Sequence, residues 1–90
     1  MIPKHRKPIH PGEILLREFL EPMGLSQIEL ARRMEVPVQR VNTLINGKRD
    51  VTAETAILLS RVLKTSAEFW MNLQGAHDLY EAREHLERAA

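Results

Sequence analysis

The chain has 90 residues, a formal net charge of +1, no cysteine and only 4% aromatic residues. This length suits one domain, and the absence of cysteine excludes disulfides, cysteine-based zinc fingers and a cysteine nucleophile. It also favours an intracellular protein, so we expect a cytoplasmic location. Because the longest apolar runs are only a few residues and none follows the basic N-terminus, we expect neither a membrane span nor a secretory signal.

The charge is distributed unevenly along the chain. Through Arg49, nine lysines and arginines stand against five acidic residues, a net charge of +4. From Asp50 onward, four stand against seven, a net charge of −3. Two surfaces with different partners would produce this asymmetry, and so would ordinary solvated faces. The asymmetry alone leaves both interpretations open.

The N-terminal residues 1–10 hold two prolines and several cations, which predicts a flexible basic arm. Pro11 then suits the first position of a helix, and Glu13 favours the positive end of its dipole. Pro22 together with Gly24 is expected to end this first helix.

A second and a third helix follow in short succession. Ser26 and Glu29 form a capping-box pattern, in which the serine accepts from the Glu29 amide and the glutamate side chain reaches back. After a short break, Pro37 begins a helix that runs to Asn46. It is expected to stop at Gly47, which readily takes the left-handed conformation.

Two longer helices complete the predicted fold. Thr52 caps the fourth, whose apolar residues cover a broad arc and predict a position in the middle of the bundle. Ser66 caps the fifth, in which Gly75 could bend or interrupt the pattern. The charged residues from Glu81 onward are expected to fray.

These elements predict an all-α protein, a five-helix bundle with an extended C-terminal helix. We divide it into the arm (1–10), a domain with a C-terminal dimerisation helix (11–82) and a charged tail (83–90). Within the domain, the second and third helices have the spacing of a helix-turn-helix from about Ser26 to Arg49.

The third predicted helix has two distinct faces. Its inner face carries Val41, Leu44 and Ile45, which can pack on the second helix where Ala31 allows a close crossing. Its outer face carries amides and a hydroxyl without any acidic residue, a set that suits base edges in a major groove. A plain helical hairpin with a solvated outer face is the alternative, and the combined spacing, cap and Asn-Gly-Lys exit favour DNA binding.

We predict two groups of DNA contacts. The base-edge candidates are Val38, Gln39, Asn42, Thr43 and Asn46. Val38, at the leading end, is placed to touch a thymine methyl group. The phosphate candidates are Gln27, Arg40, Lys48 and Arg49.

The fifth helix carries aromatic residues that can close the core or form a dimer interface. We expect Phe69 mainly in the core and Tyr80 at an interface, with both possibilities open for Trp70. The dimer-interface candidates are Trp70, Leu73, His77 and Tyr80.

Catalytic and metal chemistry find little support. His77, Glu81 and His85 lie along one helix face, but only adjacent pairs could share an ion, so we expect no metal. The histidines and carboxylates form no nucleophile–base pattern and no phosphate loop. We therefore expect no enzyme, no catalytic residues and no cofactor.

Several motifs resemble a known family. Leu25–Ala31 (LSQIELA) with Asn46–Arg49 (NGKR) resembles the Xre/Cro-type helix-turn-helix of phage repressors. His10–Leu15 (HPGEIL) and Ser66–Gln74 (SAEFWMNLQ) are similar to the HigA family of addiction-module antitoxins, over about residues 9–82. The resemblance implies a phage-repressor-like fold, a homodimer and binding to double-stranded operator DNA. It also implies a HigB partner, a RelE-like toxin that cleaves mRNA, and repression of the shared operon.

Two positions depart from the family pattern. Glu35 stands where the family commonly has glycine in the turn, and a left-handed glutamate costs on the order of 1 kcal/mol, so we expect a different turn. Pro37 stands where a capping serine is common, which removes a polar cap and a possible phosphate ligand.

Other functions remain open at this point. The chain could be a stand-alone Xre-type repressor without a toxin, or a protein-interaction module that keeps the fold without binding DNA. In the arm, His5, Arg6 and Lys7 could reach DNA phosphates, lie across a toxin, or only solubilise the chain.

Overall fold

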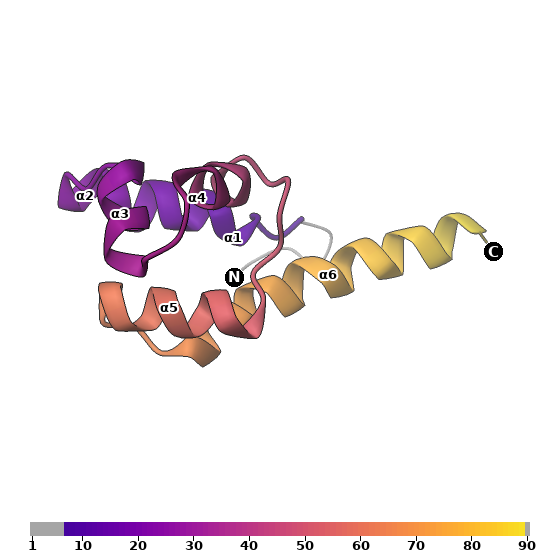
Figure 1. Ribbon diagram of the computed structural model, residues 1–90. Coiled ribbons are helices and arrows are strands. Elements are labelled where there is room, and N and C mark those ends of the chain that lie inside the picture. Colours follow the sequence, from indigo (N-terminus) through magenta and orange to yellow (C-terminus); the bar gives the residue numbers. More distant parts are fainter. Residues whose placement is uncertain (1–6, 90) are drawn as a thin grey trace.

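The computed structural model describes residues 7–89, and every regular element within them is helical. The first predicted helix consists of α1 (Pro11–Ile14), the π-helix η1 (Leu15–Leu20) and α2 (Glu21–Met23), which run on without a break. The other four are α3 (Gln27–Met34), α4 (Val38–Ile45), α5 (Ala53–Leu63) and α6 (Ala67–Ala89). The predicted all-α, five-helix architecture is confirmed (Figure 1).

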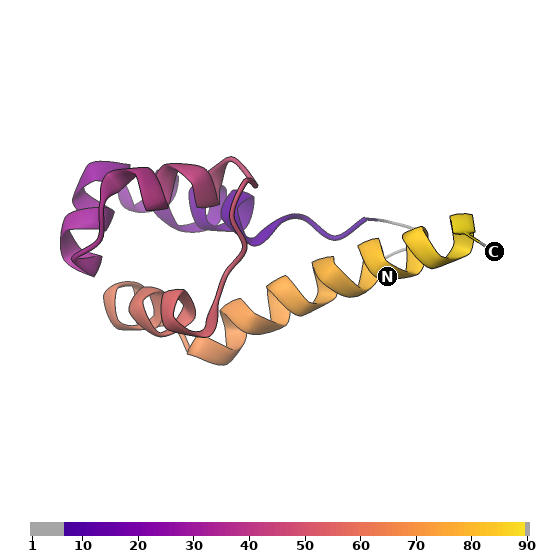
Figure 2. The ribbon, with the colours of Figure 1, turned by 45° about the vertical axis from the view of Figure 1, so that its right-hand side comes forward.

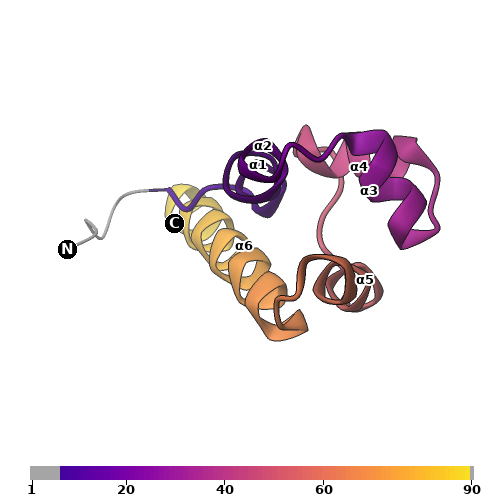
Figure 3. The ribbon, with the colours of Figure 1, turned by 90° about the vertical axis from the view of Figure 1, so that its left-hand side faces the viewer.

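The helices form two layers around one core. In Figure 1, α1 to α4 lie above α5, and α6 runs from beneath α5 past α1 and out to one side. Seen from the end, α5 faces α3, and α6 faces α1 (Figure 3). The C-terminal half of α6 projects beyond the other helices (Figure 2), which elongates the molecule to 45 × 27 × 20 Å.

Both layers contribute side chains to the core. Leu15, Leu30, Leu59 and Trp70 are all 0% exposed, so the first helix, α3, α5 and α6 meet at one centre. Trp70 also donates from Nε1 to Thr65 Oγ1 at 2.7 Å, which satisfies its polar atom inside the protein. Ile57, by contrast, is 44% exposed, so α5 is buried on one side rather than all round.

Pro22 lies within the first helix instead of ending it. A proline has no N–H, and its ring clashes with the carbonyl four residues earlier in a regular α-helix. The turn before it is widened, because the Glu21 N–H donates to the Leu16 carbonyl, a π-type bond. Gly24, with a φ of 61°, ends the helix as expected.

The turn between α3 and α4 corrects a prediction. Glu35 adopts the left-handed conformation, with φ 59° and ψ 45°, where we expected the chain to avoid it. Its N–H donates to the Arg32 carbonyl at 3.1 Å, and the Val36 N–H donates to the Ala31 carbonyl at 3.0 Å. These bonds satisfy the last carbonyls of α3 and offset the strain of the glutamate.

Half of the predicted capping box forms at the start of α3. The Glu29 N–H donates to Ser26 Oγ at 3.0 Å. The Glu29 carboxylate does not reach back, because it pairs with Arg32 and with Arg33, the latter at 2.9 Å. Hydrogen bonds from Arg32 and then Arg33 lower the pKa of Glu29 from 4.5 to about 2.

Helix α6 is longer and more regular than predicted. It continues through Gly75 without interruption and reaches Ala89, so the prediction that the chain frays from Glu81 is wrong. Ion pairs one turn apart, such as Arg88 with Glu84 at 3.6 Å, support this exposed stretch.

Candidate nucleic-acid interface

The packing of α3 on α4 fixes which side of α4 faces outward. Ala31, on α3, is 2% exposed, and Val41 and Leu44 on α4 are 1% and 2% exposed. Ile45 is partly buried against the same core. The predicted inner face is therefore confirmed, and the opposite side of α4 is left to solvent.

The predicted base-edge residues lie on that outer side. Gln39, Asn42 and Asn46 are exposed, and Val38 is 43% exposed. Thr43 is half-buried, and its hydroxyl donates to the Gln39 carbonyl at 2.9 Å. Thr43 thus offers a ligand an acceptor oxygen and a methyl group rather than a free donor.

A chain of amides joins the two helices across this face. Asn46 Nδ2 donates to Asn42 Oδ1 at 3.2 Å, and Asn42 Nδ2 donates to Gln27 Oε1 at 3.2 Å. Each bond uses only part of an amide's capacity, so donors and acceptors remain at both ends of the chain. The result is a partly ordered polar surface that includes Gln27, one of the predicted phosphate contacts.

Arg40 differs from the prediction. Its Nη2 atom pairs with Glu54 Oε1 at 2.8 Å and with Thr55 Oγ1 at 2.9 Å, and the side chain is only 23% exposed. The guanidinium therefore fastens α4 to the start of α5. Of the phosphate candidates, it is the one whose charge is already paired within the protein.

Lys48 and Arg49 follow α4 on the exposed segment that leads to α5. Gly47, with a φ of 74°, turns the chain, and the Lys48 N–H donates to the Thr43 carbonyl at 2.9 Å. Among the residues from 7 to 89, neither cation takes part in an ion pair. Both charges are available to a phosphate.

The His-Pro-Gly segment, residues 10–12, lies where α1 packs against α4. His10 Nδ1 accepts the Gly12 N–H at 2.9 Å and so caps α1. A Cβ added at Gly12 would lie 1.8 Å from the Leu44 carbonyl oxygen, so only glycine lets α1 approach α4 this closely. The sequence predicted that Pro11 begins a helix, but not the cap from His10 or the close approach at Gly12; a histidine directly before a helix-starting proline was the available signal for the cap.

Gln74 holds the segment that leaves α4. Its side chain is 3% exposed, and its Oε1 accepts the Val51 N–H at 2.8 Å. Its Nε2 donates to Asp78 Oδ1 at 2.9 Å, which leaves both ends of the amide occupied. This role was not predicted, although a glutamine one turn after Trp70 on the apolar side of a helix was a signal for it.

The four dimer-interface candidates differ in how deeply they are buried. Of the two possibilities left open for Trp70, its full burial selects the core, whereas Phe69, expected mainly in the core, is 37% exposed. His77 is largely buried, with its ring 5.1 Å from that of His10. Leu73 and Tyr80 are half-buried. Exposed apolar side chains on α6 are Phe69, Met71, Leu79 and Leu86.

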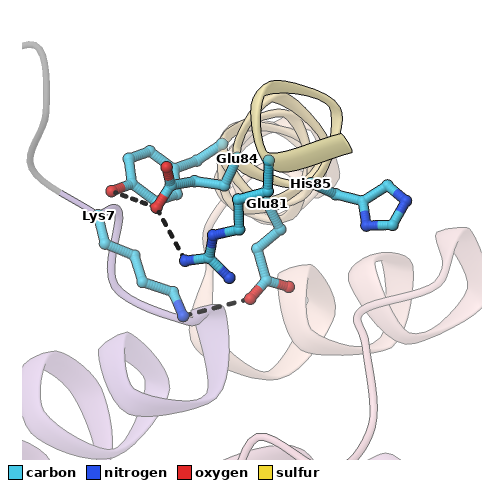
Figure 4. Close-up of a pocket in the computed structure, with 6 residues that line it drawn as sticks. Lys7, Glu81, Glu84 and His85 are labelled. Atoms are coloured by element: carbon cyan, nitrogen blue, oxygen red, sulfur yellow. Dashed lines mark hydrogen bonds and ion pairs between the residues drawn. The ribbon is translucent and has the colours of Figure 1, made fainter. Parts of the chain in front are cut away.

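A shallow polar pocket lies where the arm meets α6 (Figure 4). Lys7 pairs with Glu81 at 3.2 Å, and Arg88 and Tyr80 both contact Glu84. The ring of His85 points away from the Lys7–Glu81 pair (Figure 4). Residues 1–6 of the predicted arm, including His5 and Arg6, lie outside the described residues.

The part of the chain that the structure describes contains neither a membrane-spanning helix nor a cluster of metal-binding side chains. None of its helices is both long enough and apolar enough to cross a membrane. No group of three histidine, cysteine or acidic side chains within it is arranged to hold a metal ion.

Comparisons with known proteins place this geometry in a family. The family model described as helix-turn-helix (HTH_3) matches residues 16–70. A transcriptional regulator of Escherichia coli K12, YbaQ, is 46% identical over 81 residues, which cover 90% of this chain and 72% of that protein. Antitoxin HigA-1 of Vibrio cholerae is 44% identical over 85 residues, which cover 94% of this chain and 80% of that protein.

The solved structures agree with the sequence relatives. The structure of Pseudomonas aeruginosa antitoxin HigA with the higBA promoter is 43% identical, with a TM-score of 0.87, over 91% of this chain and 89% of that one. The relatives above are a transcriptional regulator and two antitoxins, which belong to a family of non-enzymatic DNA-binding proteins. The chain belongs to the HigA family of helix-turn-helix antitoxins.

Proposed function

We propose that this protein is an antitoxin that binds operator DNA as a homodimer, represses its own operon and neutralises a RelE-like toxin. The observation that carries the DNA-binding part is the outer face of α4. It is mostly exposed, rich in amides and free of acidic residues, and it is followed by two cations that form no ion pair with any residue from 7 to 89. The structure of the Pseudomonas aeruginosa relative, at a TM-score of 0.87, contains promoter DNA, which supports DNA binding by this fold.

Each part of the face has a separate task in the proposed complex. Gln39 and Asn42 present amides that match adenine, and Thr43 presents an acceptor and a methyl group. Lys48, Arg49 and Gln27 hold the DNA backbone and set the register. A two-fold dimer would place one α4 in each of two successive major grooves.

The test uses a DNA fragment from the region upstream of this protein's own gene. We expect Gln39→Ala and Thr43→Ala to reduce the preference for that fragment over unrelated DNA, by about 1–3 kcal/mol for each good base contact. We expect Lys48→Ala and Arg49→Ala to weaken binding to both DNAs and to flatten its salt dependence.

Matched controls separate the face from general effects. Asn72→Ala removes an exposed amide from α6, and Arg61→Ala removes an exposed cation from α5. Both should bind the fragment as the wild type does. Wild-type binding by all four α4-face variants would refute the assignment of this face to DNA.

The toxin part of the proposal rests on the family and on charge. The relative in Vibrio cholerae is named an antitoxin, and the second half of this chain carries a net charge of −3, which suits a basic ribonuclease. A small reading frame next to the gene should encode a protein that copurifies with this one on coexpression. The toxicity of that protein should disappear when the two are made together.

A stand-alone repressor is the second candidate. The Escherichia coli relative at 46% identity is named a transcriptional regulator, with no toxin in its name. Operator binding without a copurifying neighbour would select this function. Copurification without any operator binding would instead select a protein-interaction module.

A further inference from the structure

A shallow, open apolar cleft lies within the outer face described above, between the first turns of α3 and α4. Its walls include two aliphatic side chains, Ile28 from α3 and Val38 from α4. Its remaining lining is polar but uncharged, and consists of Ser26, Gln27, Gln39 and Asn42.

Ile28 stands out among the aliphatic residues of the helix-turn-helix. It is 71% exposed, and it takes no part in the core that α3 builds with Leu30, Ala31 and Met34. A single exposed isoleucine needs no explanation. Ile28, however, shares a cleft with Val38, which is 43% exposed, and amides from both helices surround the pair.

We propose that this cleft receives the 5-methyl group of a thymine in the operator, with Ile28 and Val38 as its two walls. The inference rests on the proposed function, and it adds Ile28 to the residues that determine specificity. The thymine methyl group is the one apolar group that base pairs present in the major groove. A cleft with two aliphatic walls and no charge suits that group, whereas a phosphate would need a cation or free donors.

The neighbouring amides fix where such a thymine would lie. Gln27 and Asn42 are joined by a hydrogen bond of 3.2 Å, and both line the cleft. Gln39 lines it as well and is free to pair with an adjacent base. The cleft therefore belongs to the same surface as the base-edge candidates, and its methyl group would lie beside the bases that they read.

The test removes only the methyl group. Each thymine of the protected half-site in the upstream DNA fragment is replaced, one at a time, by deoxyuridine, which leaves every hydrogen-bonding group in place. At one thymine in each half-site, we expect wild-type affinity to fall about fourfold, the ratio that corresponds to about 0.8 kcal/mol for one buried methyl group. Replacement in both half-sites should multiply the two effects.

Variants of the cleft should lose this sensitivity. Ile28→Ala and Val38→Ala should bind the thymine and deoxyuridine fragments with nearly equal affinity. Neither side chain belongs to the buried core, so both variants should fold, as circular dichroism can check. Ile57→Ala removes an exposed aliphatic side chain from α5 and should keep the full fourfold ratio.

The possible outcomes distinguish this inference from the proposed function. Sequence-specific binding that is insensitive to every deoxyuridine, or a fourfold ratio that persists in Ile28→Ala, overturns the cleft assignment and leaves operator binding intact. An Ile28→Ala variant that keeps the ratio but no longer copurifies with the neighbouring gene product would assign the cleft to a protein partner. Failure of the wild type to prefer its upstream fragment overturns the proposed function and the inference with it.

Discussion

The outer face of α4 and the first two turns of α6 use the same chemical groups in opposite ways. On α4, the amides of Asn42 and Asn46 are exposed and are bonded to each other and to the half-buried Gln27. On α6, the amide of Gln74 is 3% exposed and is bonded at both ends within the protein. A buried amide that is bonded at both ends to the protein fixes structure, whereas an exposed amide can use its remaining donor and acceptor capacity to bind something else. Gln74, in the conspicuous motif on α6, therefore has a structural role, whereas we propose that the outer face of α4 carries the recognition chemistry.

This contrast separates two kinds of variant. Changes at the start of α6, or where α1 meets α4, should lower the free energy of unfolding and affect DNA binding only through folding. Changes on the outer face of α4 should leave stability nearly unaltered and affect DNA binding directly.

Trp70→Ala should have the largest effect. The side chain is 0% exposed and meets Phe19 and Phe69 with ring centroids 5.1 and 5.0 Å away. Its removal should lower the free energy of unfolding by about 3–5 kcal/mol, as measured by urea denaturation. Phe69→Ala, at a site 37% exposed, should cost clearly less, and an equal cost would break the distinction between the two neighbours.

Gly12→Ala should follow. Since the new Cβ would lie 1.8 Å from the Leu44 carbonyl oxygen, α1 and α4 must move apart, at a cost of about 3 kcal/mol. Gly75→Ala is the matched control, because nothing lies within 4 Å of its added Cβ. Helix propensity should then raise the stability of Gly75→Ala by about 0.5–1 kcal/mol. In thermal or urea unfolding, we expect Gly12→Ala to lower the free energy of unfolding and Gly75→Ala to raise it. A change in the same direction for both variants would contradict the close contact at Gly12.

Gln74→Ala should have a smaller effect on stability. It leaves the buried Val51 N–H without its acceptor, which costs between about 1 and 3 kcal/mol. Asn72→Ala, an exposed amide on the same helix, should stay within about 0.5 kcal/mol of the wild type. Hydrogen exchange gives an independent check, because the Val51 amide should lose protection in Gln74→Ala only.

The sequence predicted the helices well because their caps and periodicity are local signals. Ser26, Thr52 and Ser66 each accept an amide N–H three residues later, as their positions at helix starts indicated. The left-handed Glu35 was not predicted, because local strain argued against it and the compensating bonds form only once α3 is complete.

The candidate site was predicted in part for the same reason. Helical spacing identified the outer face of α4, since Val41 and Leu44 had to face inward. Spacing could not reveal that Arg40 pairs with Glu54, because the partner comes from α5 and depends on tertiary packing. It also gave no reason to group Ile28 with Val38, since their cleft exists only where two helices meet.

The smallest effect on stability is expected from the ion pairs of Glu29, which lies on the same helix as Gln27 and Ile28. In NMR titration its pKa should be about 2, chiefly because Arg32, and secondarily Arg33, donate hydrogen bonds to the carboxylate. Arg32→Ala should raise the pKa of Glu29 more than Arg33→Ala does, and the double variant should approach 4.5.

Because the pKa of Glu29 is lowered in the folded state, any contribution of its ion pairs to stability is present above pH 4.5 and is lost as the pH falls toward 2. That contribution should be small, since solvent screens exposed pairs and salt should bring the pKa back toward 4.5. A wild-type pKa already at 4.5 would mean that the two arginines are free, and this part of α3 would then offer two more unpaired cations to a phosphate.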